Sequence, residues 1–272
     1  MPRLRTLSTA LLAGFLALAP AAHAVTRDGA GAAKRRVGGA AGMVRMPAGA
    51  YVPLYGRPSD PAVRVEAFQL DRDPVTRGDF LAFVRAHPEW RRGAVRPHLA
   101  DRRHYLAAWR GDLDAGDATD LRRPVTGVSW FAARAYCAAQ AKRLPTVAEW
   151  EYAAAASATS RDAARDRRFH DHLLALYTRR TTPVPPVEAA RVNAFGVRGL
   201  HDLAWEWVED FDGVRGSHDA HGVAGHEHDL FCASAAIGTS DPGNYPAFLR
   251  YAVRAGATRR TTMETLGFRC AL

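Results

Sequence analysis

One Gly-rich loop in the last third of the chain gathers the side chains with the most evident chemistry. Imidazoles and carboxylates follow each other closely there: His218, Asp219, His221, His226, Glu227, His228 and Asp229. Imidazoles at short spacing on a loop can bind zinc or copper(II). One hypothesis is therefore a metal site built on His218, His221, His226 and His228. The other is a solvated polar loop, which is favoured because no rigid ligand spacing is visible.

The chain also has three cysteines, Cys137, Cys232 and Cys270. In an oxidising compartment an odd number predicts one disulfide and one remaining thiol. Cys232 follows the histidine loop within an apolar stretch, so its first interpretation is a small buried hydrophobic residue. The alternative is a single soft metal ligand or redox thiol, which makes Cys232 the one candidate catalytic residue.

The first residues predict the compartment. Arg3 and Arg5 form a short basic region, residues 7–20 are apolar, and Ala22-His23-Ala24 has the small-x-small pattern of a signal-peptidase site. The apolar stretch is too short to span a bilayer well. We therefore expect a signal peptide at 1–24, a flexible leader at 25–42, and a periplasmic or secreted protein with no membrane insertion after cleavage.

Charge excludes one broad class of partner. The formal net charge is +9, but the arginines are scattered and form no dense basic stripe, so we expect no nucleic-acid binding. Hydrophobic residues make up 47% of the chain, which is enough for a large core. A chain of this length could form one large domain or two small ones.

The elements that position these residues begin near Met43. Residues 44–51 predict a strand with a turn, and residues 63–70 alternate apolar and polar side chains as a half-buried strand does. Thr76 and Asp79 form the pattern of a capping box, which predicts a helix with Phe80 and Phe83 on its apolar face.

Two more helices are predicted further along. One runs from Ser129, its N-cap, to about Lys142, and the next begins at Thr146, where Glu149 completes another capping box. Residues 88–120 are predicted to be irregular, and residues 161–190, which are charged and then Pro-rich, to form a surface loop. The pattern predicts an α+β domain with much irregular structure.

Several motifs that occur in a fixed order resemble the formylglycine-generating enzyme (sulfatase-modifying factor) family. They are MPAG at 46–49, DPVT at 73–76, VSWFAARAYC at 128–137, KRLPTVAEWEYAA at 142–154, NAFG at 193–196, LHDLAWEWVED at 200–210 and LGFRC at 266–270. Each is weak alone, but together they are specific. The resemblance covers residues 43–272 and implies one domain with a variant C-type lectin fold, which we expect to be a monomer.

The resemblance also implies a disulfide between Cys137 and Cys270, the cysteines of the Tyr-Cys and Gly-Phe-Arg-Cys motifs. Closing so long a loop could stabilise the fold by roughly 4–5 kcal/mol in the chain-entropy model. The alternative is two buried free thiols, which export makes less favoured.

The family's oxidase activity depends on two cysteines that hold copper(I). Counting back without gaps from the last motif puts Arg254 on a family arginine and the two cysteine positions on Asp241 and Pro246. Neither residue is a soft ligand, and no cysteine lies between Cys232 and Cys270 in any register. Copper bound in the family's mode is therefore not expected.

A calcium site of the family is only partly represented. Asp202 and Glu206 could supply the hard oxygen ligands that calcium needs. However, the stretch between them is shorter than in the family, and the missing turn carried two carbonyl ligands. The second calcium loop of the family is not recognisable in residues 161–190. The cofactor is left open, and calcium at Asp202 and Glu206 is a candidate that the shortened stretch disfavours.

The first functional hypothesis is a non-oxidising accessory or binding protein for a periplasmic redox system. Residues 230–232 and 250–254 are similar to a subgroup encoded beside copper nitrite reductases, so the expected partner is a periplasmic protein or peptide. The alternatives are a metal-dependent oxidoreductase that uses Cys232 and the loop histidines, and formylglycine generation on a sulfatase cysteine. Whether the chain is an enzyme stays open.

Overall fold

The computed structural model describes residues 42–55, 61–212, 241 and 243–272. Within these ranges, six strands pair two by two. They are β1 (Met43–Met46), β2 (Gly49–Tyr51), β3 (Val63–Val65), β4 (Phe68–Asp71), β5 (Trp205–Trp207) and β6 (Leu266–Phe268). β1 pairs with β4 and β2 with β3, both antiparallel, whereas β5 and β6 are parallel. The fold is α+β with much irregular structure, as predicted.

Three helices begin where the sequence predicts. α1 (Arg77–Ala86) and α3 (Val147–Ala154) start with complete capping boxes at Thr76 and Thr146, and α2 (Trp130–Ala139) starts with Ser129 as N-cap. In each case the hydroxyl of the N-cap accepts a hydrogen bond from a first-turn amide, which compensates one of the unpaired donors at a helix start.

Two predictions about local structure were wrong. The expected single strand at 63–70 is two strands, β3 and β4, which pair with different partners. The expected loop at 161–190 contains α4 (Arg167–Thr178). Asp166 caps this helix, and its buried residues His170, Leu173 and Tyr177 recur at helical spacing, which was obscured by the surrounding charges. The predicted irregular region at 88–120 contains only the short 3-10 turn η1 (Pro88–Trp90) and the start of η2 (Asp120–Arg122).

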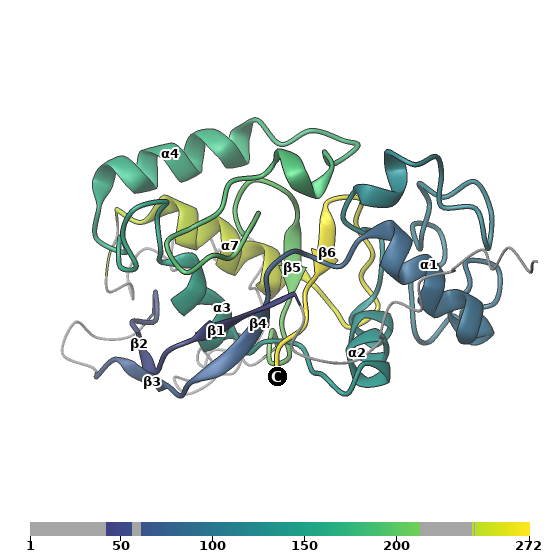
Figure 1. The fold of residues 1–272 in the computed structure, drawn as a ribbon, viewed down its shortest axis with the longest axis horizontal. Helices are drawn as coiled ribbons and strands as arrows, with labels where there is room; N and C mark the ends of the chain where they lie inside the picture. The colour runs from purple at the N-terminus through teal and green to yellow at the C-terminus, as the bar shows by residue number, and fades with distance from the viewer. Residues whose placement is uncertain (1–41, 56–60, 213–240, 242) are drawn as a thin grey trace, which may run out of the picture. The chain divides into compact units, whose positions relative to one another are not determined.

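The last helix, α7 (Tyr245–Gly256), lies alongside α4, as Figure 1 shows. Asn244 caps it by accepting a hydrogen bond from the amide of Ala247. A further 3-10 turn, η3 (Val187–Ala189), follows α4. Among the described residues, no helix is both long and apolar enough to cross a membrane.

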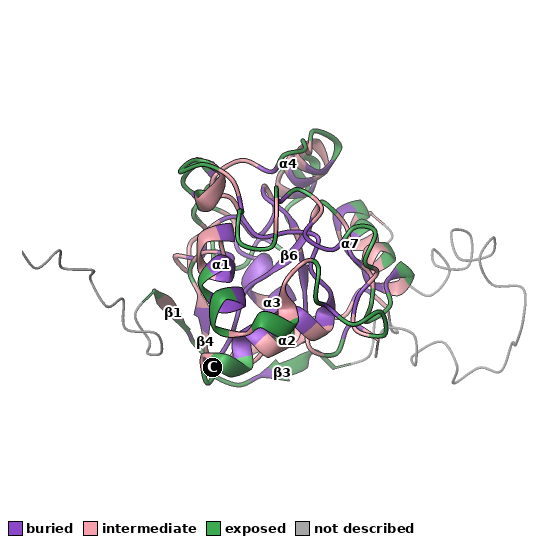
Figure 2. Cartoon of the chain, turned by 90° about the vertical axis from the view of Figure 1, so that its right-hand side faces the viewer, coloured by how far each residue is buried: buried purple, intermediate pink, exposed green. Residues whose placement is uncertain are grey.

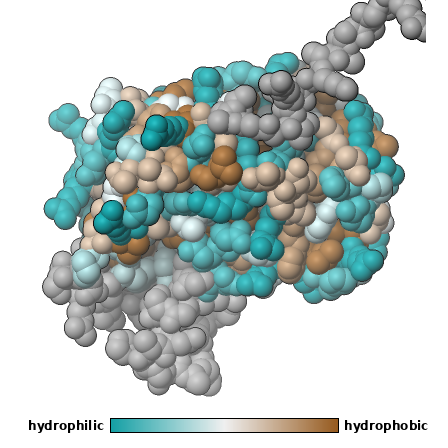
Figure 3. All heavy atoms as spheres, turned by 60° about the horizontal axis from the view of Figure 1, so that its bottom comes forward, coloured by the Kyte–Doolittle hydropathy of each residue, from teal (hydrophilic) through white to brown (hydrophobic). Residues whose placement is uncertain are grey.

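The core holds an aromatic cluster between α1, α2 and β6. Phe80 contacts Tyr136 and Phe268, with ring centroids 5.9 and 6.2 Å apart. Figure 2 shows buried residues concentrated on the inward sides of these elements. On the face drawn in Figure 3, apolar and hydrophilic residues are intermixed, so the described surface there carries no continuous apolar patch. The aromatic cluster holds the end of β6 at Phe268. Trp150 contacts the neighbouring strand β5 through a hydrogen bond to Glu206.

Candidate functional site

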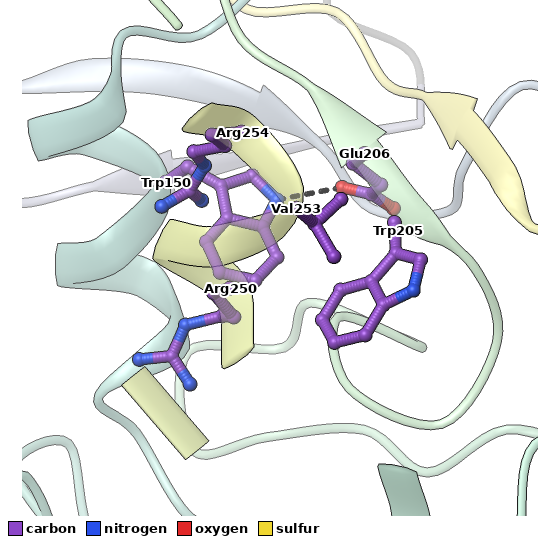
Figure 4. A pocket seen from close by; sticks show the side chains of 6 residues that line it. All are labelled: Trp150, Trp205, Glu206, Arg250, Val253 and Arg254. Carbon is purple, nitrogen blue, oxygen red and sulfur yellow. Dashed lines mark hydrogen bonds between the residues drawn. The ribbon is translucent and has the colours of Figure 1, made fainter. Parts of the chain in front are cut away.

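A small pocket forms where three distant parts of the chain meet. Its lining comes from α3, β5 and α7 and consists of Trp150, Trp205, Glu206, Arg250, Val253 and Arg254. Figure 4 shows the two indole rings on either side of Val253, with both guanidinium groups on the side of Trp150 away from Trp205. The pocket itself is therefore walled by aromatic and aliphatic surface, and its polar groups are engaged around it.

Glu206 is held on both oxygens. Arg269 donates to it twice, from Nε and Nη2, each at 2.8 Å, and the indole of Trp150 donates at 2.7 Å. The side chain of Arg269 is 0% exposed and that of Glu206 1% exposed. Arg269 also donates to the carbonyls of Asp71, Arg72 and Arg198, so this pair ties β6 to β5 and to the end of β4.

Glu151, the next residue after Trp150, meets two arginines from α7. Arg250 donates to it from Nε and from Nη2, the latter at 2.7 Å, and Arg254 donates from Nη1. Burial alone would raise the pKa of Glu151, but the two guanidinium groups outweigh it and lower the pKa to about 2. Because one carboxylate serves two cations, this cluster carries an excess positive charge.

A chain of hydrogen bonds continues from Arg250. Its Nη1 donates to the hydroxyl of Tyr177, and that hydroxyl lies 2.8 Å from Nδ1 of His201. Nε2 of His201 lies 2.8 Å from the carbonyl of Ala154. A neutral imidazole with its proton on Nε2 satisfies both contacts. Burial, helped by the nearby charge of Arg250, lowers the pKa of His201 to about 3, so the ring is neutral at ordinary pH.

Arg180 completes the surroundings of Trp205. Its guanidinium carbon lies 3.8 Å from the centroid of the Trp205 ring and 4.9 Å from that of Tyr177, which places it in cation–π contact with both. Nη2 donates to the carbonyl of His201. Burial lowers the pKa of Arg180 to about 10, although the nearby Tyr177, Glu206 and Asp202 act in the opposite direction.

These groups stabilise the fold but offer little for a reaction. Glu151 and Glu206 are saturated by arginine, and His201 has both nitrogens occupied, so none is poised to take a proton from a ligand. Within the described ranges, no group of three or more His, Cys, Asp or Glu side chains is arranged to hold a metal ion. The charged groups in the described part of the site therefore hold the fold together, and they are not arranged as a nucleophile with a base or as a metal site.

The predicted cysteine pairing fits the structure. The sulfur atoms of Cys137 and Cys270 are bonded at 2.03 Å, and both residues are fully buried. The bond joins α2 to the residues that directly follow β6. Arg143, just after α2, exchanges backbone hydrogen bonds with Ala271 beside it.

The two residues expected to bind calcium are engaged elsewhere. Glu206 is saturated by Arg269 and Trp150, and Asp202 accepts a hydrogen bond from the amide of Arg191. Calcium at this position stays an untested candidate, and Glu206 would have to leave Arg269 to serve as a ligand.

Asp241 and Pro246, expected at the family's cysteine positions, flank the start of α7. Asp241 accepts a hydrogen bond from the amide of Gly243, and Pro246 is buried in the first turn. The predicted histidine loop, with His218, His221, His226 and His228, and Cys232 lie outside the described residues, as do the signal peptide and the flexible leader.

The sequence interpretation missed the network around Glu151. Arg250 and Arg254 lie four residues apart in an otherwise apolar stretch, and Glu151 lies within the Trp-Glu-Tyr motif. Two arginines on one helical stripe, surrounded by apolar residues, were the available signal for a buried carboxylate partner.

Comparison with known proteins identifies one family. Residues 30–272 match the family described as "Sulfatase-modifying factor enzyme 1-like domain". The chain is 28% identical to inactive C-alpha-formylglycine-generating enzyme 2 of Mus musculus, over 84% of this chain and 85% of that protein. It is 26% identical to the formylglycine-generating enzyme of Streptomyces coelicolor, over 85% of this chain and 88% of that protein.

Among solved structures, PvdO from Pseudomonas aeruginosa is similar. It is 21% identical, the match covers 84% of this chain and 93% of that one, and the TM-score is 0.40.

Proposed function

Because this chain belongs to the sulfatase-modifying factor family, we propose that it is an exported, non-oxidising member that acts by binding a partner. The proposal includes cleavage of residues 1–24 and location in the periplasm or outside the cell. A buried disulfide between Cys137 and Cys270 supports an oxidising compartment.

The absence of a thiol pair carries this proposal. Cys137 and Cys270 are joined to each other, and the stretch between Cys232 and Cys270 has no cysteine. Copper(I) in a protein needs soft sulfur ligands, and Asp241 and Pro246 cannot supply them. The similarity to proteins named as inactive formylglycine-generating enzymes also supports a role without oxidation.

The partner that we propose is a periplasmic redox enzyme, with a copper nitrite reductase as the specific candidate. This finer proposal rests on the similarity of residues 230–232 and 250–254 to a subgroup encoded beside such enzymes. It is tested by tagging the mature chain and recovering it from periplasm, with a Streptomyces coelicolor formylglycine-generating enzyme as bait control. Specific recovery of a redox enzyme supports the proposal, and recovery of none contradicts it.

A second candidate is a metal-dependent oxidoreductase of the same family. It is favoured by one observation, namely that Cys232 remains outside the disulfide and follows the four loop histidines. Elemental analysis of protein purified from periplasm, together with thiol titration, tests it. Copper, iron or zinc near one equivalent, lost on a Cys232→Ser change, would support the oxidoreductase. Metal below about a tenth of an equivalent would exclude it.

A further inference from the structure

A second cavity lies between two loops and shares no lining residue with the pocket at Trp150. One loop, residues 101–103, lies between η1 and η2, and the other, residues 258–261, joins α7 to β6. The cavity has a volume of about 240 Å³, and its lining consists of Asp101, Arg103, Thr258, Arg260 and Thr261. From this lining we propose that the cavity binds a phosphate or sulfate group, either as the free ion or carried by a small organic molecule.

Hydrogen bonds hold the two loops against each other. The amide of Asp101 donates to the carbonyl of Arg260 at 2.8 Å, and the hydroxyl of Thr262 donates to the carbonyl of Asp101 at 3.0 Å. The second loop is also closed on itself, because the amide of Thr261 donates to the carbonyl of Thr258 at 2.9 Å. Both walls of the cavity are therefore in place before a ligand binds, which lowers the cost of ordering them.

The charge of the lining is positive. Arg103 donates from Nε and from Nη2 to the two carboxylate oxygens of Asp101, at 3.3 and 3.4 Å. These hydrogen bonds lower the pKa of Asp101, so it is ionised at ordinary pH and its charge is compensated by Arg103. Arg260 is exposed, and no described residue pairs with its side chain, whereas the neighbouring Arg259 pairs with Asp212. The lining therefore carries one surplus positive charge.

The lining also offers hydrogen-bond donors that are not yet used. A guanidinium only donates, so the side chain of Arg260 and Nη1 of Arg103 can serve a ligand. The hydroxyl oxygens of Thr258 and Thr261 lie 3.2 Å apart, and that of Thr261 accepts a hydrogen bond from the amide of Thr258. Whichever hydroxyl donates to the other, the second keeps its hydrogen for a ligand. These donors and the surplus cation predict an anionic ligand that is rich in oxygen.

The placement of the donors on both loops favours phosphate or sulfate over a carboxylate. A carboxylate has two oxygens in one plane, which a single guanidinium can satisfy. Phosphate and sulfate present oxygens in several directions, so donors from both loops can be used. The cavity volume of about 240 Å³ is just below the roughly 300 Å³ at which small-molecule sites begin. It therefore suits one such group with a short organic attachment.

The test is a titration of the isotope-labelled mature chain with inorganic phosphate, followed by NMR chemical shifts at constant ionic strength and pH. Sulfate, phenyl phosphate and acetate are titrated in the same way. The variant Arg260→Met removes the surplus cation, and Thr258→Val/Thr261→Val removes both hydroxyls. Arg85→Met is the matched control, because Arg85 is also exposed, pairs with no described residue and does not line the cavity. Spectra without ligand show whether each variant keeps the fold.

We expect phosphate and sulfate to produce saturable shifts of the amides in 101–103 and 258–262. Arg260→Met should weaken phosphate binding at least about tenfold, the double threonine variant should weaken it about threefold, and Arg85→Met should leave it unchanged. Acetate should bind at least about tenfold more weakly than phosphate. The proposal is overturned if phosphate produces no saturable shifts there, if Arg260→Met binds equally well, or if acetate binds as tightly as phosphate.

The remaining outcomes separate the sources of the ligand. Phenyl phosphate that binds at least as tightly as inorganic phosphate would assign the site to a group on an organic molecule, and binding of the inorganic ion alone would assign it to the free ion. Either result supports the proposal. Shifts that Arg85→Met weakens as much as Arg260→Met does would identify non-specific counter-ion binding and overturn it. None of these results bears on oxidation or on a protein partner, so failure here is distinguishable from failure of the proposed function.

Discussion

Two buried carboxylates linked to Trp150 are compensated in different ways. Glu206 meets one arginine, Arg269, and an indole, and the pair is neutral and almost fully enclosed. Glu151 meets two arginines of α7, so its cluster keeps an excess positive charge near the surface. The first arrangement ties strands together, whereas the second sets the rotation of a surface helix. The contrast suggests that Glu206 serves the fold alone, while Glu151 also determines which face α7 presents.

The largest effect is expected from Glu206→Gln. The change leaves the guanidinium of Arg269 buried without a counter-charge, which should lower the free energy of unfolding by about 4 kcal/mol. Urea denaturation of the mature chain measures it. If the variant does not fold, Glu206→Gln combined with Arg269→Met, which removes both charges, should recover folded protein. A loss below about 1 kcal/mol for Glu206→Gln would show that the pair does not hold the strands.

Glu151→Gln should cost less, about 3 kcal/mol, because the side chains of Arg250 and Arg254 are each 9% exposed, whereas that of Arg269 is fully buried. The reason for the loss also differs, since α7 is expected to detach locally. Hydrogen exchange should therefore rise in 245–256 and stay unchanged in β5 and β6. Equal exchange in both regions would mean that the two clusters are one cooperative unit.

Acidification should weaken the Glu151 side of the molecule through His201. Burial lowers the pKa of His201 to about 3 in the folded chain, against an ordinary value of 6.5. The unfolded chain therefore binds the proton first, so this stability is present above pH 6.5 and is lost as the pH falls toward 3. Between pH 6.5 and 4.5 the loss should be about 2 kcal/mol.

Urea denaturation across this pH range measures that loss. A His201→Gln variant should lack this dependence, while the exposed-site control His98→Gln should keep it. Below the ordinary pKa of Glu151, which the arginines lower to about 2, a further loss should appear with the same sign. A pH profile that His201→Gln leaves unaltered would remove His201 as its source.

The smallest effect is expected from Arg254→Met. Removing this arginine leaves the neutral pair of Glu151 with Arg250, so the free energy of unfolding should change by less than about 1 kcal/mol. Thermal and urea unfolding would both report it. A loss as large as that of Glu151→Gln would contradict the view that this cluster carries a surplus cation.

Local signals in the sequence predicted much of the fold. Three helix starts were predicted correctly from the capping boxes at Thr76 and Thr146 and from the N-cap at Ser129. These signals are reliable because a side-chain hydroxyl accepts a hydrogen bond from a first-turn amide that has no partner within the helix. The helix α4 was missed because the surrounding charged residues masked a buried stripe of only three residues, one of which is a histidine. In α7 the usual pattern is reversed, with arginines inside, so amphipathicity gave no guidance there.

The candidate site was harder to predict than the fold. Its pairs, Glu151 with Arg250 and Glu206 with Arg269, join residues that are far apart in the chain. The arginine stripe indicates that a buried carboxylate partner exists, but a single sequence does not identify which carboxylate it is. The disulfide was expected only because a family resemblance supplied the pairing. The histidine loop, the most evident chemical signal, lies outside the described residues.

We propose above all that this family member does not oxidise a sulfatase cysteine. The direct measurement is mass spectrometry of a Cys-x-Pro-x-Arg peptide incubated with the mature protein, copper(I), oxygen and a reductant. The Streptomyces coelicolor formylglycine-generating enzyme serves as the positive control. We predict an unchanged peptide mass and an intact thiol with this protein. Conversion of the cysteine to formylglycine at a rate above that of copper alone would contradict the proposal that this protein is non-oxidising.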